Sequence, residues 1–262
     1  MSGKWVNEKH PKNLQEYIIK KYFEINEDKG RLAQIAKLTD KLAVRDYVAE
    51  RIGDYTLTQL YGVWDKPEDI DFGSLPVPCV IKTNNGCATN CIIKNKEELN
   101  REVIMSKLRR WIDFPYGILS GQPHYSMIEP KILAEEFLIQ KPGSDSLPYD
   151  YKFFCFNGKP EFILFYCGRK PNSHVFMNAV YDTQWNIIES VTNSKVEERV
   201  EKPLNFDRML EYAGILSQDF EFVRIDFYNI NGRIILGEMT FTPDVYINFT
   251  RDFLKKWKNP NG

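Results

Sequence analysis

The sequence predicts an α+β fold in which helices come first and mostly antiparallel strands follow. Residues 13–53 show the apolar spacing of helices, whereas later segments alternate polar and apolar residues around turns such as Asn157-Gly158. With 262 residues, 43% of them hydrophobic, the chain can bury a substantial core. Helices followed by strands with further helices between them are typical of α+β proteins.

Composition and charge exclude several classes of function. The 35 Lys and Arg residues against 36 Asp and Glu residues give a net charge of −1, without a general attraction to nucleic acid or anionic membranes. The chain has no stretch of 18 apolar residues, so no membrane span is predicted, and the polar N-terminus lacks the apolar core of a signal peptide. The odd set of 5 cysteines suggests reduced thiols. We expect a cytoplasmic monomer or homodimer.

The N-terminal region is predicted to contain two helices, residues 13–25 and 38–53. Thr39 or Asp40 is expected to cap the second helix, and Gly53 to end it.

The remaining elements follow from periodicity and turn residues. We expect, in order, a strand-like segment at 55–63, strands at 79–83 and 91–94, a helix at 97–111, a mixed apolar and acidic segment at 132–140, hairpins at 151–166 and around 181–185, a helix at 204–216 and a last hairpin at 222–241. A loop rich in Pro, Gly and Asp at 68–78 marks the first boundary. With a second boundary after residue 140, the predicted division is residues 1–75, 76–140 and 141–262.

The most informative segment is FVRIDFYNINGRIILGEMTFTP, residues 222–243. Strand periodicity places Arg224 and Asp226 on one face of the first strand, with Glu238 and Thr240 on the corresponding face of the return strand. If the apolar faces coincide, Asp226 and Glu238 are cross-strand neighbours with Cβ atoms roughly 5 Å apart.

That arrangement predicts a cation between the two carboxylates. Carboxylates this close repel each other unless Arg224 or a hard cation such as Mg²⁺ lies between them. The pattern also places Ile235, Met239 and Phe241 together on the apolar side. A solvated strand edge with one polar face is the alternative interpretation.

Three further segments carry candidate ligand-binding groups. In VIKTNNGCATNCIIK, Lys82 precedes a glycine-containing turn whose N–H groups suit an anion, and a plain hairpin with a lysine reaching solvent is the alternative that the residues alone favour. ILAEEFLIQ, residues 132–140, is either a buried strand edge or a purine-binding segment. In PYDYKFFCFNGKP, Asp150 and Lys152 share a face, either as a surface ion pair or as contacts to ribose and phosphate. His124, in a Pro/Tyr-rich loop, is a candidate substrate contact.

These segments together resemble the ATP-grasp fold and, more closely, its TupA-like branch. The matching phrases are LTDKLAVRDYV, YGVWD, VIKTNNG, PKILAEEFL, DYKFFCFNGKP and the last hairpin, and they cover roughly residues 35–250. The resemblance implies two α+β subdomains that grip ATP between antiparallel sheets, after a short helical N-terminal region.

The resemblance also implies a function. Members of the superfamily join a carboxylate to an amine through an acyl phosphate, with ATP and Mg²⁺ as cofactors. The TupA-like branch is associated with attaching amino acids to uronic acids of cell-surface polysaccharides such as cell wall or capsule polymers. The implied partners are a small-molecule or glycan acceptor and an amino acid or amine. A kinase for a sugar hydroxyl and a non-catalytic nucleotide-binding protein are the alternatives.

Residue by residue, the resemblance implies that Asp226, Glu238 and Thr240 ligate Mg²⁺, with Thr240 where the superfamily commonly has an asparagine. Arg224 is implied near the transferred phosphoryl group, with Lys152 and Arg169 as further phosphate contacts.

The same resemblance implies a nucleotide site. Its implied residues are Lys82 for the α- and β-phosphates, the turn Asn84, Asn85 and Gly86, then Glu135, Glu136, Phe137 and Leu138 around adenine, and Asp150 and Lys152 at the ribose and phosphates. The chain departs from the branch in its loop, where Asn85 replaces a histidine and Ala88 replaces a glycine. We also expect the usual domain ahead of the ATP-grasp module to be missing or reduced to helices, which leaves the acceptor open.

Overall fold

The computed structural model describes residues 11–141, 143, 146–171, 177–189, 200–244, 249, 253 and 257. The chain forms two compact units. The larger unit combines Met1–Asp28 with Ile139–Gly262, and the smaller unit is Lys29–Leu138. The predicted three-part division at residues 75 and 140 stays a prediction.

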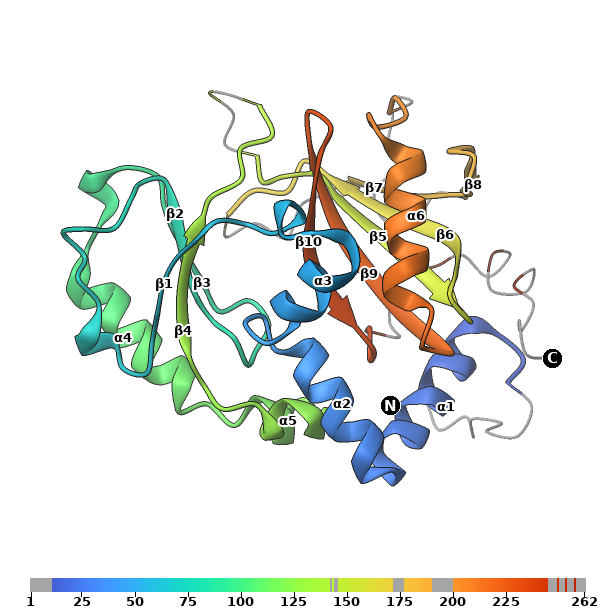
Figure 1. Ribbon diagram of the computed structural model, residues 1–262, viewed down its shortest axis with the longest axis horizontal. Helices are drawn as coiled ribbons and strands as arrows, with labels where there is room; N and C mark the ends of the chain where they lie inside the picture. Colours follow the sequence, from blue (N-terminus) through green and yellow to red (C-terminus); the bar gives the residue numbers. More distant parts are fainter. Residues whose placement is uncertain are drawn as a thin grey trace. The chain divides into compact units, whose positions relative to one another are not determined.

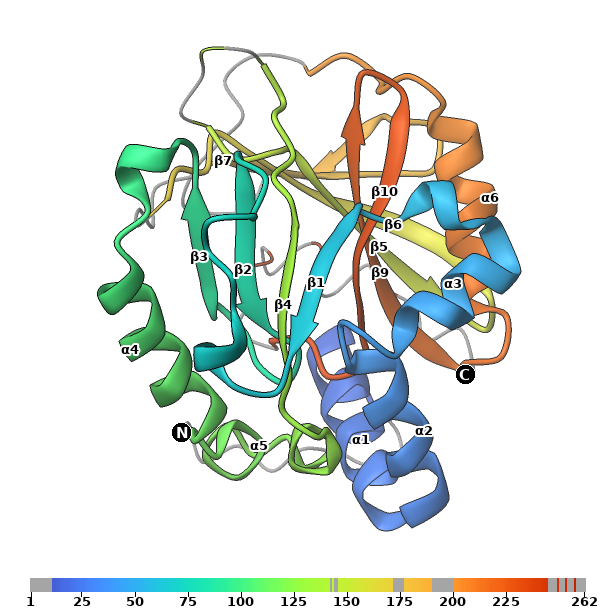
Figure 2. The ribbon, with the colours of Figure 1, turned by 60° about the vertical axis from the view of Figure 1, so that its left-hand side comes forward.

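The smaller unit is built on a four-stranded antiparallel sheet (Figure 2). Its strands are β1 (Leu60–Trp64), β2 (Cys79–Thr83), β3 (Asn90–Ile93) and β4 (Ile132–Glu136), in the order β1-β4-β2-β3. Helix α4 (Arg101–Ile112) buries Ile104 and Leu108 against Ile81 and Ala134 on one face. Because side chains alternate along a strand, Lys82 and Glu135 lie on the opposite face.

The second predicted helix, residues 38–53, begins later in the structure, as α3 in the smaller unit. That unit contains α2 (Lys29–Thr39), α3 (Val44–Ile52), α5 (Tyr116–Leu119) and the 3-10 turns η1 (Asp54–Thr56), η2 (Pro67–Asp69), η3 (Lys96–Glu98) and η4 (Pro123–Met127). Neither Thr39 nor Asp40 caps α3, because a turn separates them from Ala43, the N-cap residue. Gly53 does end α3, as predicted, with a φ of 92°.

His124, in η4, is a buried residue of the smaller unit. Its side chain is 1% exposed, its ring lies 4.6 Å from that of Tyr125, and its Nδ1 has no hydrogen-bond partner among the described residues. Burial lowers the pKa of His124 to about 4. The predicted substrate contact is therefore wrong, because the imidazole is not accessible to a ligand from solvent.

We expect the stability of the smaller unit to fall as the pH drops from 6.5 to about 4. In this range the imidazole takes up a proton in the unfolded chain but not in the folded one, so acid favours unfolding. The loss should be about 3 kcal/mol. Urea unfolding followed by tryptophan fluorescence at several pH values measures it. His124→Phe should flatten this pH dependence, and an unchanged slope would contradict the assignment.

The larger unit is built on a six-stranded antiparallel sheet. Its strands are β5 (Asp150–Phe156), β6 (Lys159–Cys167), β7 (Met177–Tyr181), β8 (Ile187–Glu189), β9 (Phe222–Ile230) and β10 (Arg233–Thr240), in the order β10-β9-β5-β6-β7-β8. The three predicted hairpins are confirmed. The β5–β6 turn has Asn157 and Gly158 at φ 48° and 75°, the left-handed pair that a tight hairpin requires.

Helices cover both faces of the larger sheet. Helix α6 (Phe206–Ser217) lies across one face (Figure 1), where Phe206 packs against Phe153. On the other face, Tyr17 of α1 (Leu14–Glu27) packs against Phe156 and Phe222. The rest of that second face carries charged side chains of β5, β9 and β10.

Two further features concern the whole of the described chain. No described helix has the length and apolar character needed to cross a membrane. All five cysteines are free thiols, and Cys87 alone among them is exposed.

Candidate nucleotide and metal site

The β9–β10 hairpin places two carboxylates side by side in the larger unit. Glu238 pairs with Asp226, and Thr240 pairs with Arg224. The predicted cross-strand arrangement is confirmed. Asp226 is 2% exposed and Arg224 is 8% exposed, so the pair is not a solvated strand edge.

A β-bulge corrects the prediction for the return strand. Ile235 pairs with Tyr228, whereas Met239 pairs with Ile225. Tyr228 and Ile225 are on opposite faces of β9, so Ile235 and Met239 do not share a face as predicted. The extra residue is Gly237, where a Cβ atom would stand 3.2 Å from the Tyr228 ring. The bulge thus keeps Glu238 beside Asp226 and turns Met239 toward the core.

Arg224 is the centre of the charged cluster. Its Nε and one terminal nitrogen donate to the two oxygens of Asp226, both at 2.7 Å. The same terminal nitrogen donates to Glu238 Oε1 at 2.8 Å and to Thr240 Oγ1 at 3.1 Å. Thr240 also donates to Glu238 Oε1, at 2.8 Å. The guanidinium therefore offsets the repulsion between the two carboxylates.

Lys152 extends the cluster onto β5. Its Nζ lies 2.5 Å from Asp226 Oδ2 and 2.8 Å from Asp150 Oδ2. Arg169 completes it with a nitrogen 3.2 Å from Asp150 Oδ2. Among the described residues, the cluster thus joins three basic side chains to three acidic ones.

Burial and neighbouring charges act against each other in this cluster. Burial raises the pKa of Asp226, and Arg224 and Lys152 oppose that shift. Although burial disfavours their charged forms, the carboxylates raise the pKa of both Lys152 and Arg224. Both basic groups therefore stay charged at neutral pH.

Sequence reasoning missed two tyrosines beside these charges. Tyr228 pairs with Asp150 across β9 and β5, accepts a hydrogen bond from Arg169, and burial raises its pKa to about 12. Tyr166 pairs with Asp150 on the other side, and Lys152 Nζ lies 5.7 Å from the centre of its ring. Strand periodicity could have identified Tyr228, because it follows Asp226 by two residues and therefore lies on the same strand face.

The donor set fits a hard divalent cation. Asp226, Glu238 and Thr240 offer oxygen ligands, which Mg²⁺ prefers. A carboxylate has about four lone-pair positions, and Asp226 uses three for Arg224 and Lys152. Among the described residues no group of three His, Cys, Asp or Glu side chains has metal-site geometry, so the predicted set depends on Thr240. The metal assignment stays a prediction.

In the smaller unit, Lys82 forms an ion pair with Glu135. Thr58 Oγ1 donates to the second oxygen of Glu135 at 2.9 Å, and Arg45 donates to the Thr58 carbonyl at 2.7 Å. The side chain of Lys82 is 14% exposed, so the alternative interpretation, a lysine that reaches into solvent, is wrong. The structure brings together the predicted phosphate and adenine residues of β2 and β4.

The predicted adenine segment continues from the end of β4. Glu136 is the last paired residue, and its side chain accepts a hydrogen bond from the Gln59 N–H at 3.0 Å. Phe137 and Leu138 follow the strand, and Leu138 is 8% exposed. Their role toward adenine stays a prediction.

The predicted phosphate loop joins β2 to β3. Asn85 and Gly86 are buried, and Ala88 has a φ of 58°, a conformation that glycine adopts more readily. All three N–H bonds of Asn84 are directed to protein oxygens: the backbone N–H to Lys131 O, and the side-chain amide to Asp40 Oδ1 and Glu129 O. Asn84 therefore has no N–H left to donate to an anion in this conformation, and its role in the nucleotide site stays a prediction.

A family model described as TupA-like ATPgrasp matches residues 20–257 of the chain. Comparison with curated proteins gives no match.

Solved structures with a similar fold include a D-alanine–D-alanine ligase from Bacillus anthracis, 16% identical, with a TM-score of 0.47 over 82% of this chain and 60% of that one. An L-amino acid ligase from Bacillus licheniformis is 14% identical, with a TM-score of 0.49 over 87% of this chain and 48% of that one. The chain thus spans 60% or less of the length of these two proteins.

Proposed function

The chain belongs to the TupA-like ATP-grasp family, and from this premise we propose that it is an ATP-dependent carboxylate–amine ligase that works through an acyl phosphate. The observation that carries the proposal is the buried cluster in which Arg224 bridges Asp226 and Glu238. Buried charges are costly to maintain, so such a cluster is expected where charged groups act on a ligand.

Asp226, Glu238 and Thr240 hold Mg²⁺ in this proposal. When bound, the metal neutralises charge on the ATP phosphates. The oxygen donors described above support this assignment.

The basic residues of the larger unit act on the transferred phosphoryl group. A carboxylate oxygen of the acceptor bonds to the γ-phosphorus while the bond to the β,γ-bridging oxygen breaks, and ADP leaves. Arg224, Lys152 and Arg169 hold positive charge where negative charge is redistributed. An amine nitrogen then bonds to the acyl carbon, inorganic phosphate leaves and the nitrogen loses a proton.

The remaining predicted residues orient the nucleotide. Lys82 binds the α- and β-phosphates, and Glu135 with the backbone at Phe137 and Leu138 contacts adenine. Asp150 accepts a hydrogen bond from the ribose. The 2.8 Å contact between its Oδ2 and Lys152 Nζ supports a place for Asp150 beside the phosphate-binding residues of this proposal.

For the substrates we propose an amino acid or amine and a uronic acid of a cell-surface polysaccharide or its precursor. The TupA-like membership supports this choice. The near-neutral charge of the chain also fits a small or glycan acceptor better than a nucleic acid.

The proposal predicts that ADP and phosphate are released in equal amounts only when both a carboxylate and an amine are present. Purified protein with Mg-ATP is assayed against a panel of uronic acids paired with amino acids. Hydroxylamine replaces the amine in a parallel series, because it traps an acyl phosphate as a hydroxamate. The product should weigh the sum of the two substrates minus one water.

Two outcomes contradict the ligase assignment. ADP release with a stable phosphorylated acceptor, independent of amine, indicates a kinase. Thermal stabilisation by Mg-ATP without turnover or hydroxamate across the panel indicates a nucleotide-binding protein. Glu238→Gln serves as the inactive control.

A further inference from the structure

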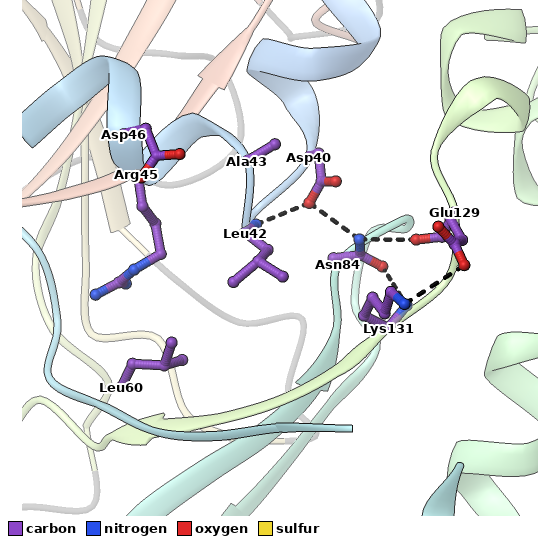
Figure 3. A pocket seen from close by; sticks show the side chains of 9 residues that line it. All are labelled: Asp40, Leu42, Ala43, Arg45, Asp46, Leu60, Asn84, Glu129 and Lys131. Atoms are coloured by element: carbon purple, nitrogen blue, oxygen red, sulfur yellow. Dashed lines mark hydrogen bonds and ion pairs between the residues drawn. The ribbon is translucent and has the colours of Figure 1, made fainter. Parts of the chain in front are cut away.

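In the smaller unit, the turn between α2 and α3 contacts Asn84, the first residue of the predicted phosphate loop. The side-chain amide of Asn84 donates to Asp40 Oδ1 at 3.0 Å and to Glu129 O at 3.0 Å. Its oxygen accepts from the Lys131 N–H at 2.8 Å. Figure 3 shows these contacts beside a hollow of about 370 Å³ in the same unit.

Asp40 is itself held in place by the turn. The same oxygen that meets Asn84 accepts the Leu42 N–H at 2.8 Å. The Lys41 N–H reaches the Asn84 carbonyl at 3.4 Å. Asn84 is 1% exposed, so these contacts are shielded from water and form a rigid base for the loop.

A second contact acts further along the loop. The Lys41 ammonium donates to the Gly86 carbonyl. In a trans peptide the carbonyl and the following N–H point in opposite directions, so this contact directs the Cys87 N–H away from Lys41. A loop that binds an anion needs such a fixed orientation of its N–H groups.

We propose that Asp40 and Lys41 are positioning residues that set the conformation of loop 84–88 for phosphate binding, and that Asn84 is part of this clamp instead of a contact to the nucleotide. The inference rests on the proposed function for the use of the loop. The clamp itself is independent of that function.

Cys87 reports on the loop without any assay of activity. It is exposed, whereas the other four cysteines are buried. Its Sγ is held 3.6 Å from the Tyr125 hydroxyl, so a loop that leaves this position frees the thiol further. Alkylation of the native protein by iodoacetamide, followed by mass spectrometry, should then become faster.

We expect Lys41→Met and Asp40→Ala to raise the alkylation rate of Cys87 about tenfold, because each removes a contact to a buried polar group. Both should raise the KM for Mg-ATP about tenfold with a smaller change in kcat. Lys41→Arg, which can still donate to the Gly86 carbonyl, should restore both values. Thermal melting confirms that each variant is folded.

Matched controls lie on the two helices that flank the turn. Lys37→Met on α2 makes the same charge change as Lys41→Met, and Asp46→Ala on α3 matches Asp40→Ala; both residues are exposed. Neither control should change alkylation or the KM for Mg-ATP.

The readouts separate the two proposals. Unchanged alkylation in folded Lys41→Met and Asp40→Ala overturns the clamp, whether or not the protein is a ligase. Faster alkylation with unchanged affinity for Mg-ATP shows that the loop does not serve the nucleotide and overturns the positioning role. The affinity for Mg-ATP can be measured by calorimetry even if the protein shows no ligase turnover.

Discussion

Asp226→Asn is expected to reduce turnover on the order of 10³-fold and to lower the free energy of unfolding by about 3 kcal/mol. The carboxylate accepts two hydrogen bonds from Arg224 and one from Lys152. An amide cannot replace it, because in either orientation its NH₂ group faces a nitrogen donor. The substitution also leaves the buried cluster with an uncompensated positive charge.

ADP release as a function of Mg²⁺ concentration and urea unfolding measure the two effects. Asp207→Asn is the control, because Asp207 forms an ion pair with Lys202 at 2.8 Å but its side chain is 86% exposed. Exposed pairs contribute little to stability, so this control should keep activity and stability. Full turnover of Asp226→Asn at ordinary Mg²⁺ concentrations would show that the carboxylate is not a metal ligand.

Much of the fold could be predicted because the relevant signals are local. Asn157-Gly158 specified a hairpin turn, and the alternation of Arg224 and Asp226 with apolar neighbours specified which face each side chain takes. These are properties of a few adjacent residues. The expectation that the apolar faces coincide placed Glu238 near Asp226, but regular pairing from the turn would put Gly237 there, and it is the bulge that brings Glu238 opposite Asp226.

Local pattern could not predict features that depend on packing. The bulge at Gly237 interrupts the alternation, and its reason is the Tyr228 ring on the neighbouring strand. Similarly, the contact between Asn84 and Asp40 joins residues 44 positions apart. Asn84 lies in a segment with the composition of an anion-binding turn, so its role in holding the turn could be seen only in the structure.

The ion pairs of the larger unit show the same limit. The family resemblance implies separate contacts for Asp150 and Arg169, to the ribose and to a phosphate, yet an Arg169 nitrogen lies 3.2 Å from Asp150 Oδ2. Sequence periodicity orients Asp150, which is in β5, but does not orient Arg169, which follows the end of β6. Residues beyond the ends of strands have no such periodicity.

Arg224→Met is expected to reduce turnover on the order of 10³-fold, and it should also destabilise the protein by about 3 kcal/mol. Without Arg224, Asp226 and Glu238 repel each other and the cluster carries a net negative charge. Steady-state ADP release and urea unfolding measure the two losses. Arg224→Lys keeps the charge but cannot donate to both oxygens of Asp226 in parallel, so it should recover part of the stability and little of the activity.

The double variant Arg224→Met/Asp226→Asn separates catalysis from folding. Removing one positive and one negative side chain restores the charge balance, and the new amide can turn its oxygen toward Lys152. Replacing both members of a buried pair is often close to neutral, so stability should return to within about 1 kcal/mol of the original protein. Turnover should remain as low as in the single variants, because the charge that acts on the phosphoryl group is still missing. Recovered turnover in the double variant would mean that the two residues serve the fold alone, and a stability loss equal to the sum of the single losses would mean that they are not coupled.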